Sequence, residues 1–232
     1  MPSASSTVVT TEVSGGVDGW SGRSQTLFGR HQWPVTLRHG PVVLAPIRIR
    51  DRAAWDRVRT ANAAWLRPWE ATLPPESEAG PSTFAGLVRT LTKQAKAGRT
   101  LPWLVHYEVT PGRVQLVGQL TVSGIVGGSA SWGQVGYWID ERYAGRGIIP
   151  TAVALAVDYC FDVMKLHRIE IAIRPENTKS LRVVAKLGFR PEGLRPRYLH
   201  IDGDWRDHLV FALNREEVPE GLVRRWENLR PR

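Results

Sequence analysis

Two glycines and two arginines are concentrated in the stretch RYAGRGIIP, residues 142–150. This stretch follows an alternating run, QVGYWID, and precedes a long apolar run, so we expect a turn between a strand and a helix. Because glycine has no side chain, Gly145 and Gly147 let the main chain approach a ligand closely. The unpaired amides at a helix start and the positive end of the helix dipole form an anion site. The stretch therefore predicts a pyrophosphate site.

The neighbouring side chains support a pyrophosphate site, and the spacing of the glycines excludes two common phosphate-binding loops. Arg142 and Arg146 add charge-assisted donors, and Pro150 fits the first turn of a helix, where no N–H bond is lost. A Walker loop has four residues between its glycines and a following Lys-Ser/Thr, and a Rossmann fingerprint has a third glycine where Pro150 stands. Both are excluded. For the two glycines alone, an ordinary tight turn remains the alternative.

Three segments resemble those of one protein family. Arg142-x-x-Gly145-x-Gly147 is similar to the acyl-CoA pyrophosphate motif of the GNAT superfamily of N-acetyltransferases. The block NTKSLRVVAKLGFRPEG, residues 177–193, resembles the Asn-x-x-Ser…Lys-x-Gly-Phe segment of the RimJ/RimL branch, which includes ribosomal-protein alanine N-acetyltransferases. WLRPWE, residues 65–70, resembles the acceptor-side segment of RimJ-type members. The likeness extends from about residue 33 to residue 214.

The resemblance implies an α+β fold with a mixed, mostly antiparallel central sheet flanked by helices. Two strands of this sheet splay apart and admit acyl-CoA, and here they would be residues 134–140 and 168–174. Acetyl-CoA is the implied co-substrate, without a metal, and the main chain of Trp138 and Ile139 would pair with pantetheine amides. The implied cofactor-binding residues are Trp138, Ile139, Arg142, Ala144, Gly145, Arg146, Gly147, Ile148, Asn177 and Ser180.

The implied reaction is direct transfer of an acetyl group to a primary amine, with no covalent enzyme intermediate. Glu70 is the first candidate for the general base, and it would bind the acceptor together with Trp69; a solvated loop glutamate is the alternative. Tyr198 and His200 are further candidates. Leu199 occupies the approximate place where some RimL-type proteins carry a carboxylate, so the identity of the base stays open.

The resemblance also gives roles to the block that begins at Asn177. Ser180 would donate to the departing thiolate. Asn177 would contact pantetheine, although an asparagine here is also a good helix N-cap. Lys179, Arg182 and Lys186 either contact the 3′-phosphate or form a solvated helix face, and we favour the solvated face for Lys179.

The rest of the sequence predicts the elements that hold this site. Period-two runs bounded by Gly, Pro and Asp-Gly pairs are typical of strands and hairpins, and period-3.6 runs are typical of helices. No regular alternation of strand and helix appears, which excludes a doubly wound domain. We expect a strand pair within 34–50, helices at 51–68 and 81–98, strands at 101–109, 114–122 and 134–140, a helix at 149–165, a strand at 168–174, a helix at 177–188 and a closing hairpin at 198–213.

Composition sets the domain organisation. The 232 residues include ten tryptophans and can bury one large core. We expect an N-terminal extension at 1–32, rich in Ser, Thr and Gly, then one domain at 33–214, and a C-terminal helix or tail at 215–232. The net charge of +9 favours acidic partners such as phosphates, nucleotides or ribosomal RNA.

The sequence indicates a cytoplasmic protein. No apolar run reaches the roughly 18 residues that a membrane span needs, and the N-terminus lacks the pattern of a signal peptide. Cys160 is the single cysteine and lies in an apolar run, so it is interpreted as a core residue. The six histidines show no metal-binding spacing.

Three functions remain open at this point. The first is acetylation of the N-terminal α-amine of a protein such as a ribosomal protein, with association of the enzyme with the ribosome. The second is acetylation of a small amine such as an antibiotic or a polyamine, which would favour a closed, acidic pocket. The third is a non-catalytic, basic module that binds RNA or the ribosome. The sequence does not indicate an oligomeric state.

Overall fold

The computed structural model describes residues 33–77 and 80–229, and the predicted extension at 1–32 lies outside this part of the chain. The strands are β1 (Leu37–His39), β2 (Val42–Pro46), β3 (Leu101–Thr110), β4 (Arg113–Val126), β5 (Trp132–Ile139), β6 (Arg168–Ile173), β7 (Arg190–Ile201) and β8 (Asp204–Asn214). The helices are α1 (Arg52–Ala61), α2 (Ala63–Leu66), α3 (Phe84–Lys96), α4 (Ile148–Asp162), α5 (Thr178–Leu187) and α6 (Leu222–Leu229). Single 3-10 turns are η1 (Ile49–Asp51), η2 (Arg67–Trp69), η3 (Glu141–Tyr143) and η4 (Arg215–Glu217).

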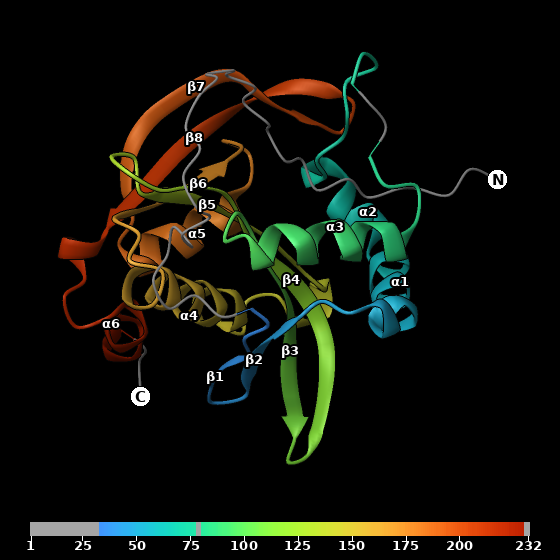
Figure 1. Cartoon of the computed structure of the whole chain (residues 1–232), viewed down its shortest axis with the longest axis horizontal. Helices are drawn as coiled ribbons and strands as arrows, with labels where there is room; N and C mark the ends of the chain where they lie inside the picture. The colour runs from blue at the N-terminus through green and yellow to red at the C-terminus, as the bar shows by residue number, and fades with distance from the viewer. Residues whose placement is uncertain (1–32, 78–79, 230–232) are drawn as a thin grey trace, which may run out of the picture.

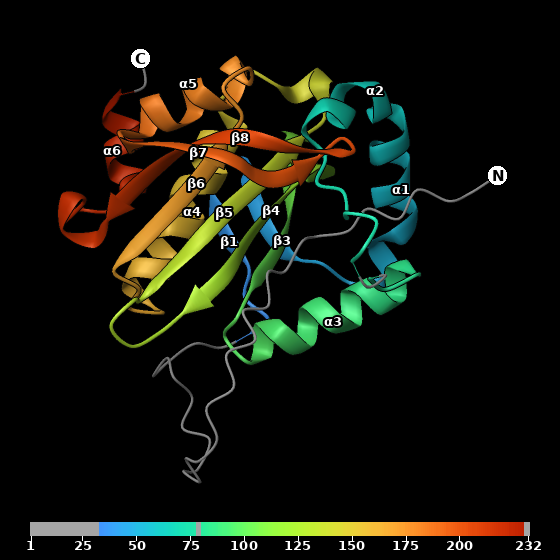
Figure 2. The same cartoon turned by 90° about the horizontal axis from the view of Figure 1, so that it is seen from above.

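The strands form one eight-stranded sheet in the order β1-β2-β3-β4-β5-β6-β8-β7. Within the described residues, β5 and β6 pair in parallel, and the other neighbours are antiparallel. Helices α4, α5 and α6 lie on one side of the sheet, and α1, α2 and α3 lie on the other (Figures 1 and 2). This arrangement confirms the predicted α+β fold with a mixed, mostly antiparallel sheet.

The alternation of side chains along β3 builds two cores. Leu101, Trp103 and Val105 are fully buried in the large cluster that contains α4. Leu104, between them in the sequence, points to the opposite face and joins a smaller cluster with Trp55 of α1. Helix α4 is apolar nearly all round because it is enclosed by the sheet, α5 and α6.

The C-terminal segment packs into the large core. Trp226 of α6 is buried and donates its indole N–H to Thr151 Oγ1 of α4 at 2.9 Å. Asp158 of α4 accepts the main-chain N–H groups of Leu222 and Val223, at 2.6 and 3.0 Å, and so satisfies the free amides at the start of α6. The helix expected within 215–232 thus covers α4.

Several predicted boundaries differ from those of the structure: the helix expected at 51–68 is divided into α1, α2 and η2, β4 continues to Val126, and α4 ends at Asp162. Helix α3 begins at Phe84, because Thr83 caps it by accepting the Gly86 amide at 3.0 Å. Strand β7 begins at Arg190, well before the predicted start at 198. Its pairing with β8 shifts register twice, between residues 191 and 193 and between residues 195 and 199. These bulges interrupt the period-two pattern by which a strand is recognised in a sequence.

An ion-pair network that connects β6 and β7 across β8 makes a testable contribution to acid stability. Arg168 and Arg190 each donate to Glu192 Oε1 at 2.9 Å, and these hydrogen bonds lower the pKa of Glu192 from 4.5 to about 2. A depressed carboxyl pKa stabilises the fold above the unfolded-state value, and the effect disappears as the pH falls through the folded-state value. Glu192→Gln should therefore lower the free energy of unfolding at pH 7, and the difference from wild type should vanish between pH 4.5 and 2.

Urea unfolding across this pH range measures the effect. Glu220→Gln is the matched control, because Glu220 pairs with Arg224 and both side chains are 67% exposed. Parallel pH profiles for wild type and Glu192→Gln would contradict the prediction.

Candidate active site

The cleft of this protein begins where two neighbouring strands separate. Strands β5 and β6 pair only over three residues, from Trp132 opposite Arg168 to Gln134 opposite Glu170. Beyond this point they diverge, and a cleft of about 1330 Å³ opens between them. Its lining comes from β4, β5, the start of α4, α5, the α2–η2 segment and the β7–β8 hairpin. The divergence agrees with the splayed strands expected within 134–140 and 168–174.

The start of α4 forms an anion-binding corner at the edge of this cleft. Gly145 and Gly147 have φ angles of +79° and +77°, in the left-handed region that favours glycine. The first helical bond runs from the Thr151 amide to the Gly147 carbonyl. The amides of residues 145–149 make no regular hydrogen bond to any other described residue. A Cβ added at Gly145 would meet nothing within 4 Å, so the space at this corner is open to a ligand.

The arginine side chains of this motif lie elsewhere. Arg142 Nη2 contacts Asp140 Oδ2 at 2.6 Å, and the Arg146 guanidinium lies 5.1 Å from the centre of the Tyr143 ring. Burial opposes ionisation of Asp140, but the hydrogen bonds from Arg142 outweigh it and lower the pKa of this carboxyl. Ala144, Gly145, Gly147 and Ile148 line the cleft, whereas Arg142 and Arg146 do not. At this corner the positive potential comes from main-chain amides and the α4 dipole.

The main-chain groups of β5 alternate between its two edges. The Asp140 amide donates to the Val117 carbonyl at 2.7 Å, so the main chain of Trp138, two residues earlier, also pairs with β4. Ile139 points its carbonyl to the open edge, where it accepts the Trp65 indole N–H at 3.0 Å. Of the pair expected to meet pantetheine, the structure directs Ile139 but not the main chain of Trp138 to the cleft.

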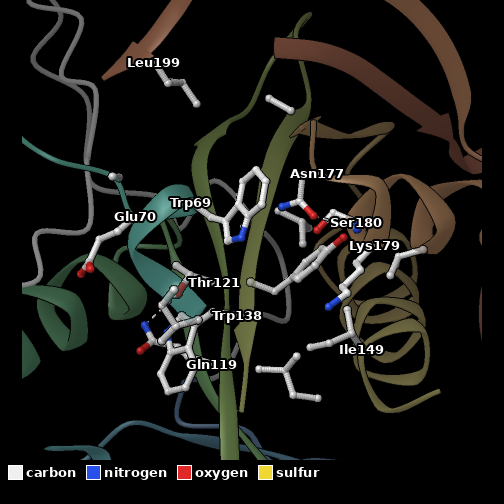
Figure 3. Close-up of a pocket in the computed structure, with 18 of the residues that line it drawn as sticks. Trp69, Glu70, Gln119, Thr121, Trp138, Ile149, Asn177, Lys179, Ser180 and Leu199 are labelled. Atoms are coloured by element: carbon white, nitrogen blue, oxygen red, sulfur yellow. Dashed lines mark hydrogen bonds between the residues drawn. The ribbon is translucent and has the colours of Figure 1, made fainter. Parts of the chain in front are cut away.

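Helix α5 presents Asn177 and Ser180 to the cleft (Figure 3). Asn177 caps the helix, because its Oδ1 accepts the Ser180 amide at 3.1 Å. The Tyr137 hydroxyl is a polar neighbour of Ser180, but it is buried without a regular hydrogen bond. Burial raises the pKa of Tyr137 to about 12, so this phenol keeps its proton at neutral pH. Tyr137 was not among the predicted site residues, because its place in the strand is typical of a core aromatic residue.

Two cation–π contacts hold the α2–η2 segment against the other side of the cleft. Lys179 Nζ lies 3.8 Å from the centre of the Trp65 ring, and the Arg174 guanidinium lies 5.4 Å from the centre of the Trp69 ring. Arg174 also donates to the Pro68 carbonyl at 2.7 Å. Lys179 is exposed even though its ammonium lies over the Trp65 ring, so the choice between a solvated helix face and a contact to the 3′-phosphate stays a prediction. Arg182 and Lys186, on the same helix, line the cleft.

Glu70 lies in the wall of the cleft, where an arginine side chain pairs with its carboxylate. Its carboxylate forms an ion pair with Arg59, whose guanidinium lies 5.4 Å from the ring centres of both Trp55 and Trp138. Figure 3 shows the Glu70 carboxylate turned away from Trp69 and from the Asn177–Ser180 side of the cleft. The sequence analysis missed Arg59, because its partners are brought together only by the fold.

The other candidates for the base lie on β7, beside Leu199, in the same cleft. His200 Nδ1 lies 2.8 Å from Thr72 Oγ1, which leaves Nε2 as the nitrogen that can exchange a proton with a ligand. Tyr198 accepts a hydrogen bond from Arg195 Nη1 at 3.0 Å. The structure thus brings Glu70, Tyr198 and His200 to one cleft, and their roles stay predictions.

Three further features concern the described part of the chain. No three His, Cys, Asp or Glu residues gather there into a possible metal site. No helix in this part has the length and apolar character that crossing a membrane requires. Cys160 is fully buried, and burial raises the pKa of its thiol, which disfavours the nucleophilic thiolate.

Comparison with known proteins gives consistent matches. A family model for the acetyltransferase (GNAT) domain matches residues 42–190. The ribosomal protein uS5-alanine N-acetyltransferase of Escherichia coli (strain K12) is 30% identical over 175 residues, which cover 75% of this chain and 88% of that protein. Mycobacterium smegmatis RimJ, solved in complex with CoA-disulfide, is 38% identical with a TM-score of 0.75, and the match covers 84% of this chain and 95% of that one.

A further relative is matched over part of its length. The probable N-acetyltransferase YjcK of Bacillus subtilis (strain 168) is 40% identical over 99 residues, which cover 43% of this chain and 55% of that protein. The chain thus matches about half the length of YjcK but nearly all of M. smegmatis RimJ. The domain match includes both splayed strands and the glycine turn between them. The chain therefore belongs to the GNAT family of acetyltransferases and is an acyltransferase.

Proposed function

We propose that this protein transfers the acetyl group of acetyl-CoA directly to the N-terminal α-amine of a protein, such as a ribosomal protein. The observation that carries the proposal is the cleft between β5 and β6, which ends at the unpaired amides of residues 145–149. An extended pantetheine arm fits between two splayed strands, and a diphosphate fits a helix start. The uS5-alanine acetyltransferase and the CoA-containing RimJ among the relatives support this substrate pair.

The proposed reaction gives each group a role. With the diphosphate at the start of α4, pantetheine follows the open edge of β5 and brings the thioester toward Ser180 and Tyr137. An open-edge N–H of β5 stabilises the negative charge that develops on the thioester oxygen. The amine nitrogen attacks the carbonyl carbon, the carbon–sulfur bond breaks, and the thiolate takes a proton from the Ser180 hydroxyl, which regains a proton from water.

The α-amine of the acceptor needs little activation before it attacks. An α-amino group has a pKa of about 7.7–8.0, whereas a lysine side chain has a pKa of about 10.4. At neutral pH a fraction of the α-amine is therefore already uncharged, and a weak base suffices to accept its remaining proton. Glu70, Tyr198 and His200 are the candidates for this base, acting directly or through water.

The charges in the cleft disfavour a polyamine acceptor. The acidic lining residues Glu70 and Glu176 are paired with Arg59 and Arg174, respectively. The remaining acidic residue of the lining is Glu141. A polycation would require free carboxylates at the acceptor end, and this cleft also carries the basic residues of α5. The alternative of a spermidine-type acceptor therefore has little support from the structure.

An acetyl-CoA assay with a panel of peptides that differ in the first residue tests the proposed function. The control peptides carry a blocked N-terminus and an internal lysine. We expect acetylation of free N-termini and none of the blocked peptides. Equal acetylation of the blocked peptides would assign the enzyme to lysine side chains. Transfer to neither class, combined with salt-dependent RNA binding, would favour the non-catalytic module.

Glu70→Gln tests the first candidate for the base. If Glu70 accepts the proton of the amine, directly or through water, kcat for a peptide acceptor should fall about tenfold or more. The affinity for acetyl-CoA, measured by calorimetry, should stay unchanged, because Glu70 lies on the other side of the cleft from the α4 corner. His200→Gln is the comparison. Full turnover by Glu70→Gln together with a loss in His200→Gln would move the base to His200.

A further inference from the structure

A glycine in the centre of the sheet is uncovered. Gly136 lies in β5, the fifth of eight strands in spatial order, and yet it is exposed. A Cβ added to Gly136 would meet nothing within 4 Å. Most residues at the centre of a sheet are covered by side chains from a neighbouring layer. Here the cleft leaves the sheet open above Gly136.

Polar side chains surround this opening. Thr121 of β4 is the cross-strand partner of Gly136, and it accepts a hydrogen bond from Gln119 Nε2 at 3.3 Å. The Gln119 carbonyl oxygen in turn accepts the Trp55 indole N–H at 3.0 Å, so Gln119 is fixed. Figure 3 shows Gln119 and Thr121 joined on the side of the cleft where Trp138 lies.

Gln134 holds an unused donor in the same region. Its Nε2 is buried and has no hydrogen-bond partner among the described residues, although Gln134 lines the cleft. A buried amide donor without a partner costs about 1–3 kcal/mol. Because β5 alternates its side chains, Gln134 and Gly136 share a face, two residues apart. Rotation of the Gln134 side chain, which lines the cleft, would turn this buried donor toward a ligand carbonyl oxygen above this face.

This face lies opposite the side that carries the α4 corner. Val135, Tyr137 and Ile139 pack with the core around α4. Trp138, which shares the face of Gly136, packs with the cluster of α1 and α3 instead. The acyl donor therefore reaches the reaction centre from the α4 side of the sheet, and the face with Gly136 and Gln134 remains for the acceptor.

We infer that Gln134 and Gly136 form the subsite for the first residue of the acceptor. Gln134 Nε2 donates to the carbonyl oxygen of that residue, and the open space above Gly136, beside Thr121, receives its side chain. The expected acceptor is a peptide whose first carbonyl group and first side chain both bind in this cleft. This assignment rests on the proposed acetylation of N-terminal α-amines.

Gly136→Ala and Gly136→Val test whether the space above Gly136 receives the first side chain of the acceptor. The kcat/KM is measured for peptides that begin with Gly, Ala, Ser and Leu, together with the KM for acetyl-CoA. A Cβ at position 136 should reduce kcat/KM about tenfold for peptides beginning with Ala or Ser, relative to those beginning with Gly, and Val should reduce it further. The KM for acetyl-CoA should not change. Thermal unfolding identifies any loss of folded protein, and Gly136→Ala keeps the test valid if Gly136→Val does not fold.

Gln134→Ala tests the carbonyl contact. This variant should lose about tenfold in kcat/KM for peptides, as expected for a hydrogen bond to a neutral group. It should lose nothing for a simple primary amine that lacks a carbonyl. A residue that only supports the sheet would lower both rates equally.

Each result decides the assignment. Unchanged first-residue selectivity in Gly136→Ala, or an equal loss for peptides and simple amines in Gln134→Ala, would overturn the subsite while leaving the proposed function intact. A wild-type enzyme that acetylates no peptide would contradict the proposed function and remove the subsite with it.

Discussion

Gly145→Asp should weaken the binding of acetyl-CoA by at least about 100-fold, which is about 2.7 kcal/mol, and this loss should exceed the loss of stability caused by the left-handed φ at this position. The new carboxylate would stand in the open space beside the unpaired amides of residues 145–149. There it would satisfy those amides itself and repel the diphosphate. Calorimetric titration of the purified protein with acetyl-CoA measures the loss.

Two controls separate charge from backbone strain. Gly145→Asn places a side chain of the same shape at the same φ without the charge, and asparagine tolerates this region well. Gly112→Asp introduces the same carboxylate at a glycine with the same φ, +79°, in the β3–β4 turn, and a Cβ there also meets nothing within 4 Å. We expect a much smaller loss of affinity in Gly145→Asn and none in Gly112→Asp. Unchanged affinity in Gly145→Asp would remove the anion site from this corner.

Ser180→Ala should lower kcat by about 100-fold or more, the range expected when a general acid is removed. The thiolate that departs from the acetyl group needs a proton, and the Ser180 hydroxyl lies in the cleft with the buried Tyr137 phenol as its neighbour. Acetyl-CoA affinity should change little. The cap of α5 should also persist, because Asn177 bonds the main-chain amide of residue 180 and not its hydroxyl.

Two further variants locate the proton donor. Ser180→Thr retains the hydroxyl and should keep most of the activity. Tyr137→Phe should also lower kcat, and its effect should not add to that of Ser180→Ala if the two hydroxyls act as one chain. Because the pKa of Tyr137 is about 12, its protonation should not limit kcat at pH values up to 9. Full activity of Ser180→Ala with a large loss in Tyr137→Phe would make Tyr137 the donor.

Local signals in the sequence were sufficient for the main-chain part of the site. Two glycines before an apolar helix predicted the turn, and both adopt the left-handed conformation that needs glycine. Asn177 predicted a helix cap, and it accepts the Ser180 amide. Such features depend on residues a few positions apart, so a pattern of residue types records them. The strand pair within 34–50 and the closing hairpin were also accessible, through turn residues and periodicity.

Side-chain partners brought together by the fold were not predictable in this way. Arg142 and Arg146 follow the motif, yet Asp140 and Tyr143 hold them outside the cleft lining. The charge of Glu70 is neutralised by an ion pair with Arg59 of α1. The space above Gly136 depends on strands, helices and a hairpin that come together only in the fold and leave this residue uncovered. The spacing of residues in a sequence does not show which position of a sheet the surrounding side chains will leave uncovered.

A crystal structure of the protein with acetyl-CoA is the most direct test of the central claim. We predict diphosphate oxygens about 2.7–3.2 Å from the amide nitrogens of Gly145, Gly147 and their neighbours at the start of α4, with pantetheine between β5 and β6. A complex in which the diphosphate binds elsewhere, or in which a protein side chain fills that corner, would contradict the account.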